Sequence, residues 1–378
     1  MKNISAIIYF IFCASFVHAQ YTVKIIVTAI GAKARDDIYI AGNFNDWKPS
    51  DISSKLKPFA GGRHIIVFNN IDTGLFEFKF TRGSWEKGET TAKGEEIENR
   101  ILDIKNDTSI EVTIAGWKDD FPDKPIPNTT SVNVHIIDTA FFIPQLNRYR
   151  RIWIYLPPSY NQTKSKAYPV LYMHDGQNLF NEQTAGFHIE WGVDECLDTL
   201  SRQLNKECIV VGIDNDSTKR INEYNPYDDA KYGRGEGKQY IDFIVQTLKP
   251  HIDSNYRTIK DAKHTAVAGS SMGGLISMYA LVQYPDVFGT AGIFSPSFWI
   301  APQLYTDVAD AKWQKSFRIY FYAGEKESVT MVKDMQKMFN IVKQKNCCDL
   351  QYVTFPLGQH NEKYWREEFD DFYRWLMK

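Results

Sequence analysis

Cysteine is scarce in this chain, with five residues among 378, and one of them, Cys13, lies in an N-terminal apolar run. The other four are too few for a fold built on disulfides, although one pair could be oxidised in an exported protein. The sequence does not indicate which of the four would pair: Cys196, Cys208, Cys347 and Cys348. Neither a CxxC nor an HExxH motif occurs, so we predict no metal and no cofactor.

The chain also lacks an excess of charge of either sign. Lysine and arginine number 44 against 46 aspartates and glutamates, and no basic block stands out. Nucleic acid and anionic membrane surfaces are therefore not expected as partners. Beyond the first 19 residues no stretch is apolar enough to predict a membrane span. Hydrophobic residues nevertheless make up 43% of the chain, which is enough for packed domains.

The first 19 residues have the features of a signal peptide for export. Lys2 supplies a positive start, residues 4–17 are apolar, and Val17-His18-Ala19 resembles a cleavage site. The apolar run has 14 residues, fewer than the roughly 20 that span a bilayer as a helix. We therefore predict cleavage after Ala19 and a mature protein that is periplasmic or extracellular.

Residues 20–118 have the pattern of β-strands. Apolar and polar residues alternate around 23–27, 76–80 and 110–114, and turn signals such as Gly42-Asn43 separate these runs. A segment of this length and pattern is expected to form a small antiparallel β-sandwich. Residues 119–130 then bring three prolines and several charges, and we interpret them as a linker.

Strand and helix patterns alternate over residues 131–378. Short apolar runs predict strands at 169–174, 208–213, 264–269, 289–294, 317–323 and 350–355. Amphipathic helices are expected near 188–203, 238–250, 273–284, 329–344 and 361–377. This alternation predicts an α/β domain in which helices cover both faces of a mainly parallel sheet.

The pentapeptide Gly269-Ser270-Ser271-Met272-Gly273 carries the most specific chemical signal. An apolar strand precedes it and a helix follows, which is the context of a nucleophile elbow. The glycines permit a sharp turn that would project the Ser271 hydroxyl above the edge of the sheet, at a helix N-terminus that favours developing negative charge. The alternative is a glycine-rich packing turn without chemistry.

A nucleophilic serine needs a base, and the base needs an acid that orients it. His360 is the only histidine after Ser271, and it lies between the last strand and the last helix. The acid should follow the preceding strand, where Glu325 and Glu327 are both available. We favour Glu327 because Glu325 leaves the strand at once, and Asp334 is a distant third candidate.

Two backbone amides should form the oxyanion hole of such a site. Met272 follows the nucleophile directly and supplies the first. The second should come from the loop after the early strand, where Gly176 permits close approach and Gln177 is our candidate. His174 and Asp175 lie far upstream of the serine, and we interpret them as loop scaffolding.

These segments resemble the esterase D / enterochelin-esterase-like group of α/β-hydrolases, which includes feruloyl, acetyl xylan and siderophore esterases. The resemblance covers residues 131–378 and rests on residues 170–180, the Gly269–Gly274 elbow, Ser295-Pro296-Ser297-Phe298-Trp299 and Gly358-Gln359-His360-Asn361-Glu362 with Trp365. It implies an α/β-hydrolase fold, and it carries the nucleophile onto Ser271, the base onto His360 and the acid onto Glu327. Substrates vary within the group, so the resemblance does not choose one. Trp191 and Trp299 could line the cleft, with buried packing the alternative for each.

The N-terminal segment is similar to starch-binding modules of the CBM20 and CBM48 type. The similarity rests on residues 38–47 and 76–80, on Trp85-Glu86 and on Glu98-Asn99-Arg100. It places a sugar-stacking platform on Trp47 and Trp85, with Lys79 and Asn99 alongside. An insertion at 87–97 separates Asn99 from the rest of that pattern. The alternative is a spacer or docking domain with Trp47 in its core.

Together these patterns predict an exported serine esterase with a Ser271–Glu327–His360 triad that acts on acylated carbohydrate, with a glycan-binding N-terminal module. The second hypothesis is an esterase for siderophores or other small esters with a structural N-terminal domain. The third is a catalytically inactive glycan-binding protein, against which the complete set of candidate residues argues.

Overall fold

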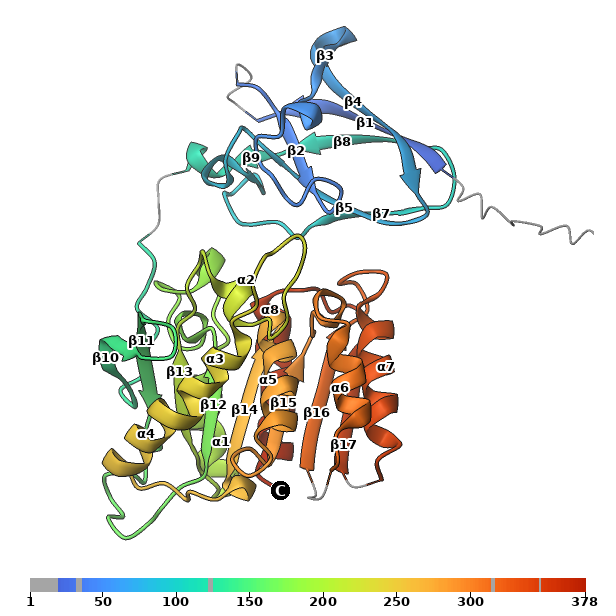
Figure 1. Ribbon diagram of the computed structural model, residues 1–378. Coiled ribbons are helices and arrows are strands. Elements are labelled where there is room, and N and C mark those ends of the chain that lie inside the picture. The colour runs from blue at the N-terminus through green and yellow to red at the C-terminus, as the bar shows by residue number, and fades with distance from the viewer. Residues whose placement is uncertain (1–19, 32–35, 122–124, 314–316, 347) are drawn as a thin grey trace, which may run out of the picture. The chain divides into compact units, whose positions relative to one another are not determined.

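The computed structural model describes residues 20–31, 36–121, 125–313, 317–346 and 348–378. The predicted signal peptide, residues 1–19, and Cys347 lie outside these ranges. The chain divides into two compact units, Met1–Pro125 and Ile126–Lys378, which we call the N-terminal and the C-terminal domain (Figure 1). The division falls inside residues 119–130, the segment interpreted above as a linker.

Two β-sheets and a separate strand pair make up the N-terminal domain. One sheet has the strand order β3-β4-β1-β8 and the other β2-β5-β7, while β6 pairs with β9. The strands are β1 (Gln20–Ile30), β2 (Tyr39–Gly42), β3 (Lys57–Phe59), β4 (Arg63–Asp72), β5 (Gly74–Thr81), β6 (Glu89–Thr90), β7 (Arg100–Ile104), β8 (Thr108–Ile114) and β9 (Gly116–Trp117). Alternate apolar side chains of both sheets, such as Ile25, Phe78 and Ile104, are fully buried in one shared core. The small all-β sandwich expected from the alternation is present.

The sandwich is not purely antiparallel, and that part of the expectation was wrong. Strands β1 and β8 run parallel, with Val23 opposite Thr108 and Ile26 opposite Glu111. Strands joined by a tight hairpin must be antiparallel, but nearly the whole domain separates β1 from β8 in the chain. Alternation along a strand determines which side chains face the core and says nothing about the direction of a distant neighbour.

An eight-stranded sheet forms the centre of the C-terminal domain, with the order β10-β11-β13-β12-β14-β15-β16-β17. Its strands are β10 (Val134–Ile143), β11 (Arg148–Tyr155), β12 (Val170–His174), β13 (Ile209–Ile213), β14 (Thr265–Ser270), β15 (Thr290–Phe294), β16 (Phe317–Gly324) and β17 (Cys348–Phe355). The last six are mutually parallel, and each coincides with a strand predicted from an apolar run. Strands β10 and β11 add antiparallel pairs at one edge. The expected α/β architecture with a mainly parallel sheet is confirmed.

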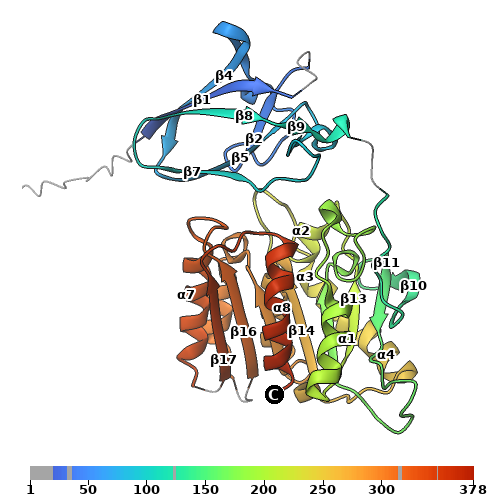
Figure 2. The same cartoon turned by 180° about the vertical axis from the view of Figure 1, so that it is seen from behind.

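Helices cover both faces of this sheet (Figures 1 and 2). Helices α1 (Val193–Leu204) and α8 (Glu362–Leu376) pack together on one face. The other face carries α3 (Gly237–Phe243), α4 (Lys249–Asn255), α5 (Met272–Gln283), α6 (Gln303–Asp310) and α7 (Met331–Lys343), and a short α2 (Arg220–Glu223) precedes them. A π-helical turn, Ile244–Leu248, joins α3 to α4.

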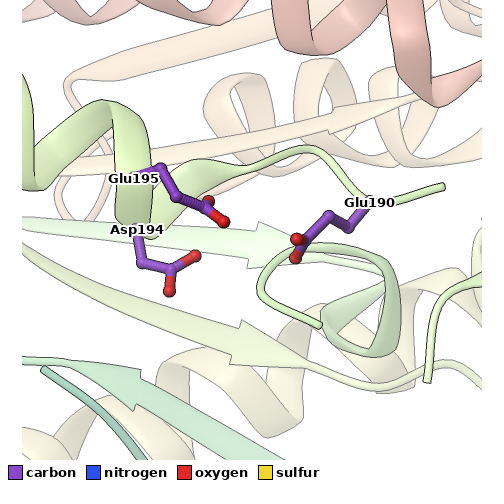
Figure 3. Close-up of side chains that lie close together, drawn as sticks. All are labelled: Glu190, Asp194 and Glu195. Carbon is purple, nitrogen blue, oxygen red and sulfur yellow. The ribbon is translucent and has the colours of Figure 1, made fainter. Parts of the chain in front are cut away.

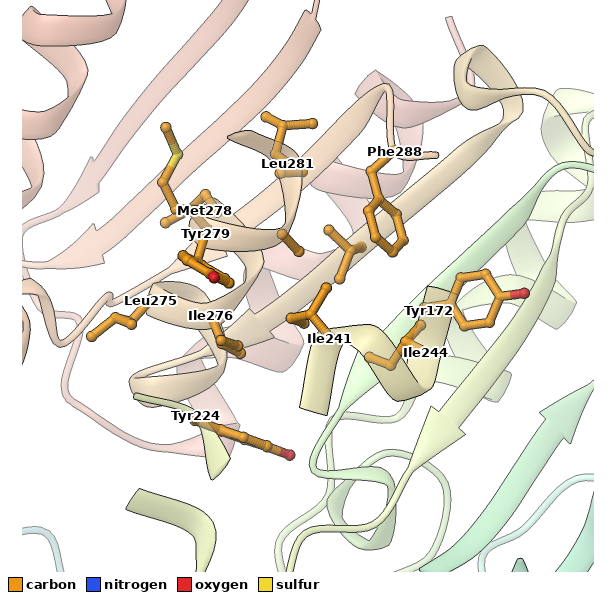
Figure 4. Packing of buried hydrophobic residues seen from close by; sticks show 14 of the residues in the cluster. Tyr172, Tyr224, Ile241, Ile244, Leu275, Ile276, Met278, Tyr279, Leu281 and Phe288 are labelled. Carbon is orange, nitrogen blue, oxygen red and sulfur yellow. The ribbon is translucent and has the colours of Figure 1, made fainter. Parts of the chain in front are cut away.

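A separate hydrophobic core lies on each face of the sheet. The larger core packs strand residues such as Tyr172 against Ile241, Ile276 and Phe288 from the α3–α5 side (Figure 4). The other core includes Trp191 and four apolar residues of α8. These four form the buried face of the amphipathic helix predicted near residues 361–377: Trp365, Phe369, Phe372 and Trp375.

Two of the expectations drawn from the sequence concern membrane spans and the cysteines. Within the described residues no helix has both the length and the apolar character needed to cross a membrane. Cys196 and Cys208 carry free thiols, and burial raises the pKa of each thiol to about 12. Both thiols are therefore protonated at neutral pH and poor nucleophiles.

Candidate active site

Ser271 lies at the sharp turn between β14 and α5. Its φ of 58° and ψ of −119° are a strained combination that residues other than glycine rarely adopt. The Ser271 amide donates to the carbonyl of Phe294 at 2.9 Å and so holds the turn against strand β15. A Cβ atom at Gly274 would lie 2.9 Å from that same oxygen, so the close approach requires glycine. The strand–turn–helix context expected around Ser271 is present.

The Ser271 hydroxyl lies 3.0 Å from the hydroxyl of Ser297, which follows strand β15. The Ser297 amide also donates to the Ser271 carbonyl at 3.1 Å. Among the described residues no hydrogen bond joins Ser271 to His360. Hydrogen bonds in active sites without substrate are often long or unformed, and rotation about χ1 would release the Ser271 hydroxyl from Ser297.

Glu327 and His360 form a pair at the carboxyl ends of β16 and β17. His360 Nδ1 lies 2.8 Å from Glu327 Oε2, and because a carboxylate only accepts, Nδ1 carries the proton. The other oxygen of Glu327 accepts from Ser295 Oγ and from the Gly324 amide, each at 2.6 Å. The Glu327 side chain is fully buried, whereas that of His360 is about one-third exposed. The carboxylate is therefore fixed from two sides and the imidazole remains accessible.

Ser295 connects this pair to the core of the domain. It accepts a hydrogen bond from the indole N–H of Trp365 at 2.8 Å while it donates to Glu327. The Trp365 ring also meets the His360 ring edge-on, with 5.1 Å between the centroids. In the sequence Ser295 and Trp365 appear only as members of a family pattern, and nothing in their spacing signals this contact.

Two glycines bring the loops of Glu327 and His360 together. A Cβ atom at Gly324 would lie 2.3 Å from the backbone carbon of Gly358, so the two loops touch at a distance that only glycine allows. The Lys326 amide donates to the Gly358 carbonyl at 3.0 Å. Glu325 points elsewhere, with its exposed carboxylate 3.0 Å from Thr354 Oγ1. His360 thus contacts Glu327 and not Glu325.

The expected oxyanion amides lie at the ends of β14 and β12. Met272 is the first residue of α5, and Gln177 lies in a 3-10 turn, Gly176–Asn178, after β12. Within the described part of the chain neither amide donates a hydrogen bond. The Gln177 side chain accepts from the Asn215 amide at 3.1 Å, and its carbonyl accepts from Thr184 Oγ1 at 2.7 Å. Both amides are thus available to an external acceptor.

His174 and Asp175 support this loop, as expected for scaffolding. Burial lowers the pKa of His174 to about 4, so the imidazole is neutral, and its Nδ1 lies 2.9 Å from the Tyr240 hydroxyl. Asp175 has a left-handed φ of 57° and binds Arg220 through two hydrogen bonds of 2.7 Å. Burial alone would raise the pKa of Asp175, but Arg220 and Asn215 hold it below its usual value.

Glu362 is a further acidic residue near the site that the sequence did not single out for a role. It begins α8, and its Oε1 accepts from the Asn178 side chain at 3.1 Å. Burial raises the pKa of Glu362 to about 7, with Asp175 adding to the rise and His360 and Arg220 opposing it. A carboxyl group that is partly protonated near neutrality therefore lies between the Gln177 loop and His360.

Of the two tryptophans considered for the cleft, only Trp299 is exposed. Its side chain is 46% accessible and lies two residues after Ser297. Trp191 is buried and stacks on Trp365 with 5.7 Å between centroids, so the packing alternative holds for it.

In the N-terminal domain the side chains of Trp47 and Trp85 lie next to each other. Their ring centroids lie 6.4 Å apart with 40° between the planes, and both side chains are half-buried. Trp47 does not belong to the buried core of the described domain, so its placement in the core under the spacer alternative was wrong. Lys79 lies on β5 between the core residues Phe78 and Phe80, and Asn99 donates to Glu77 at 3.3 Å. No hydrogen bond or cation–π interaction joins Lys79 or Asn99 to either tryptophan among the described residues.

Residues 143–376 match the family described as "Putative esterase". The match spans Ser271, Glu327 and His360 and almost all of the C-terminal domain. The chain belongs to this esterase family. The resemblance of its C-terminal part to carboxylic ester hydrolases is therefore confirmed.

Three curated relatives of the esterase illustrate both of its domains. The uncharacterized protein YbbA of Bacillus subtilis is 28% identical over 242 residues, 60% of this chain and 92% of the relative. An endo-1,4-beta-xylanase/feruloyl esterase of Xylanibacter ruminicola is 25% identical over 200 residues, 51% of this chain and 25% of the relative. An alpha-amylase of Niallia circulans is 32% identical over 87 residues, 23% of this chain and 7% of the relative. The amylase match concerns the N-terminal part and agrees with a starch-binding-like module there.

Among solved structures, the enterobactin esterase FES of Shigella flexneri, determined in the presence of enterobactin, is similar to the esterase with a TM-score of 0.57. The sequences are 16% identical, and the match covers 91% of this chain and 88% of the other. At this identity the likeness concerns the fold alone.

Proposed function

We propose that the protein is an exported serine esterase that removes acyl groups, of the feruloyl or acetyl type, from carbohydrates. The observation that carries the serine mechanism is the arrangement along one sheet edge. Ser271, Ser297, Glu327 and His360 follow four consecutive strands of the sheet, β14 to β17, and hydrogen bonds link them in two pairs. This edge is where catalytic groups of open α/β sheets gather.

In the proposed mechanism His360 Nε2 takes the proton of Ser271 as Oγ attacks the ester carbonyl. Glu327 keeps the proton of His360 on Nδ1, so that Nε2 is free to accept, and stabilises the imidazolium that forms. The amides of Met272 and Gln177 bind the oxyanion, since neither donates a hydrogen bond to another described residue. His360 then protonates the leaving alcohol, which departs from an acyl-Ser271 intermediate. A water activated by the same histidine releases the acid and restores Ser271.

Trp47 and Trp85 support the proposal that the ester group of the substrate is attached to a carbohydrate. Two partly exposed indoles at an angle can cover the apolar faces of neighbouring sugar rings. Lys79 and Asn99 are proposed to bind hydroxyl groups beside them. Two relatives are named as enzymes that act on carbohydrate polymers, a xylanase/feruloyl esterase and an alpha-amylase. These names are consistent with this substrate class. Export after cleavage at Ala19 would place the enzyme where such polymers occur.

The experiment that tests the proposed function combines a covalent probe with a panel of esters. A serine-reactive fluorophosphonate should label the full-length protein on the peptide that contains Ser271. Acetylated and feruloylated oligosaccharides should then be hydrolysed faster than catecholate siderophore esters. Preference for the catecholate esters would favour the siderophore hypothesis, and absence of both labelling and turnover would favour a catalytically inactive glycan-binding protein.

We expect the double variant Trp47→Ala/Trp85→Ala to separate binding from catalysis. Hydrolysis of a small soluble ester should stay unchanged, because neither residue belongs to the C-terminal domain. Retention of the full chain in starch or xylan affinity gels should weaken about thirtyfold, since each of the two stacked rings contributes about 1 kcal/mol. Activity on an acylated polysaccharide should fall with it, because the local substrate concentration is lost.

A matched control for this experiment is Phe59→Ala, which removes an exposed aromatic ring from β3 of the same domain. This variant should be retained like the wild-type protein. If Phe59→Ala and the double tryptophan variant behave alike, or if the wild-type protein is not retained by any glycan, the N-terminal domain is a spacer.

A further inference from the structure

Three carboxylates converge at the start of helix α1, and none of them belongs to the catalytic groups assigned above. They belong to Glu190 in the preceding loop and to Asp194 and Glu195 in the first turn of the helix. One oxygen from each lies within 4.8 Å of the other two. Figure 3 shows the three side chains turned toward a common point.

Two of these carboxylates are buried and incompletely hydrogen-bonded. Glu190 is fully buried, and neither of its oxygens has a partner with full hydrogen-bond geometry among the described residues, while the Thr129 hydroxyl interacts with it more weakly. Asp194 is also fully buried; its Oδ2 accepts from the Ser131 amide at 2.7 Å, but its Oδ1 has no partner within the described chain. A buried carboxylate oxygen without a donor is costly, so such groups are normally paired or bound to a metal.

One cation of the protein lies nearby and cannot balance the cluster. Arg366 Nη2 is 3.6 Å from Glu190 and 3.8 Å from Glu195, which is too far for hydrogen bonds. Three carboxylates against one guanidinium leave two negative charges, and the helix N-terminus offsets only about half of one.

We propose that Glu190, Asp194 and Glu195 bind a divalent cation, and that this cation is Ca²⁺. The donors are all carboxylate oxygens, which are ligands of hard cations. Ca²⁺ holds its oxygens at about 2.3–2.6 Å, so ligands on opposite sides of the ion lie about 5 Å apart, which accommodates the spread of the cluster. Mg²⁺ binds at about 2.1 Å in a strict octahedron and usually keeps several waters, so a set of three protein carboxylates suits Ca²⁺ better.

The segment before β10 offers further oxygen ligands. Ser131, whose amide binds Asp194, follows Thr130, and the Thr130 hydroxyl is buried with no partner among the described residues. Water would complete the coordination, as is common for Ca²⁺. The ion would thereby tie the residues before β10 to the start of α1.

The site would also stabilise the surroundings of the candidate catalytic acid. Trp191 follows Glu190 directly and stacks on Trp365, whose indole N–H binds Ser295. Ser295 in turn holds Glu327. Binding of Ca²⁺ should therefore order Trp191, Trp365 and Ser295, which pack behind Glu327. The effect on catalysis rests on the proposed function, whereas the binding of Ca²⁺ does not.

The test is thermal unfolding of the full-length protein with excess EDTA or with Ca²⁺. We expect Ca²⁺ at ~100 times its Kd to raise the Tm of the C-terminal domain by about 5 °C. Tb³⁺, a luminescent substitute for Ca²⁺, should show emission sensitised by Trp191, and added Ca²⁺ should displace it. Glu190→Gln should abolish both responses while it leaves the Tm in EDTA equal or higher, because a buried negative charge is removed.

Glu367→Gln is the matched control, since Glu367 is exposed and lies next to Arg366 outside the cluster. It should respond to Ca²⁺ like the wild-type protein. The proposal is overturned if Ca²⁺ does not change the Tm and Tb³⁺ emission is absent, or if Glu190→Gln responds like the wild type. It is also overturned if Glu190→Gln lowers the Tm equally in EDTA and in Ca²⁺, which would mark an ion pair with Arg366. Because unfolding and luminescence need no ester substrate, the result does not depend on catalysis.

Discussion

Ser271→Ala is expected to reduce kcat for an activated aryl ester by about 10⁶ while the fold remains intact. The variant loses the atom that attacks the carbonyl, and the amides of Met272 and Gln177 alone can supply only a small residual acceleration. The methyl group of alanine fits the site, because the Ser271 hydroxyl makes one hydrogen bond, to Ser297, on a half-exposed residue. Steady-state kinetics measures the loss, and circular dichroism with the Tm verifies the fold.

The neighbouring serine provides the control for this experiment. Ser270 ends strand β14 and is buried, and its hydroxyl makes no hydrogen bond within the described residues. Ser270→Ala should retain activity within a few-fold and lose no phosphonate labelling. Activity of Ser271→Ala within tenfold of the wild type, or an equal loss at both positions, would remove Ser271 from the proposed mechanism.

The second large effect is expected at Glu327, where replacement by glutamine should cost about 10⁴ in kcat. The glutamine amide can present its NH₂ group to His360 Nδ1, which then must accept, so the proton moves to Nε2 and the base is blocked. Glu327 is buried and accepts from Ser295 and Gly324, so its orientation cannot easily change to relieve this. The loss should appear in kcat with little change in KM.

Glu325→Gln is the matched comparison, because it makes the same chemical change two residues earlier in the same loop. Its carboxylate is exposed and contacts Thr354, so we expect activity within about twofold of the wild type, as for most surface substitutions. If Glu325→Gln proves the more damaging of the two, the role of the acid passes to Glu325. A Ser295→Ala variant should show a smaller loss in kcat than Glu327→Gln, since Gly324 still holds the carboxylate.

Much of the C-terminal domain could be predicted from local sequence patterns. Five of the six parallel strands, β12 to β16, are buried on both faces, so each is a nearly continuous apolar run. The sixth, β17, lies at the edge of the sheet, and its residues are partly exposed. The edge strands β10 and β11 were not predicted, because charged residues interrupt the apolar pattern in both. In β11 three arginines form ion pairs with acidic residues elsewhere in the domain, among them Glu223 and Asp214, and no local pattern shows these partners.

Some residues of the candidate site could likewise be identified from local sequence patterns, and others could not. Ser271 could be identified because the elbow is a local motif, and His360 because no other histidine follows it. The preference for Glu327 over Glu325 was an argument about a loop, and the contact that distinguishes them depends on the touching glycines Gly324 and Gly358. The roles of Ser295 and Trp365, and the convergence of Glu190 with Asp194 and Glu195, have no signature in the spacing of the residues.

The sequence by itself therefore determined the alternation of elements, the all-β and α/β character of the two domains, and the positions of Ser271 and His360. Periodicity and turn motifs are local properties, and a single stretch of chain is enough to express them. Only the tertiary structure decided that β1 and β8 run parallel, that Glu327 contacts His360, and that three carboxylates meet at α1. These features depend on which distant segments become neighbours, and that follows from the order of strands in the sheets and from packing on their faces.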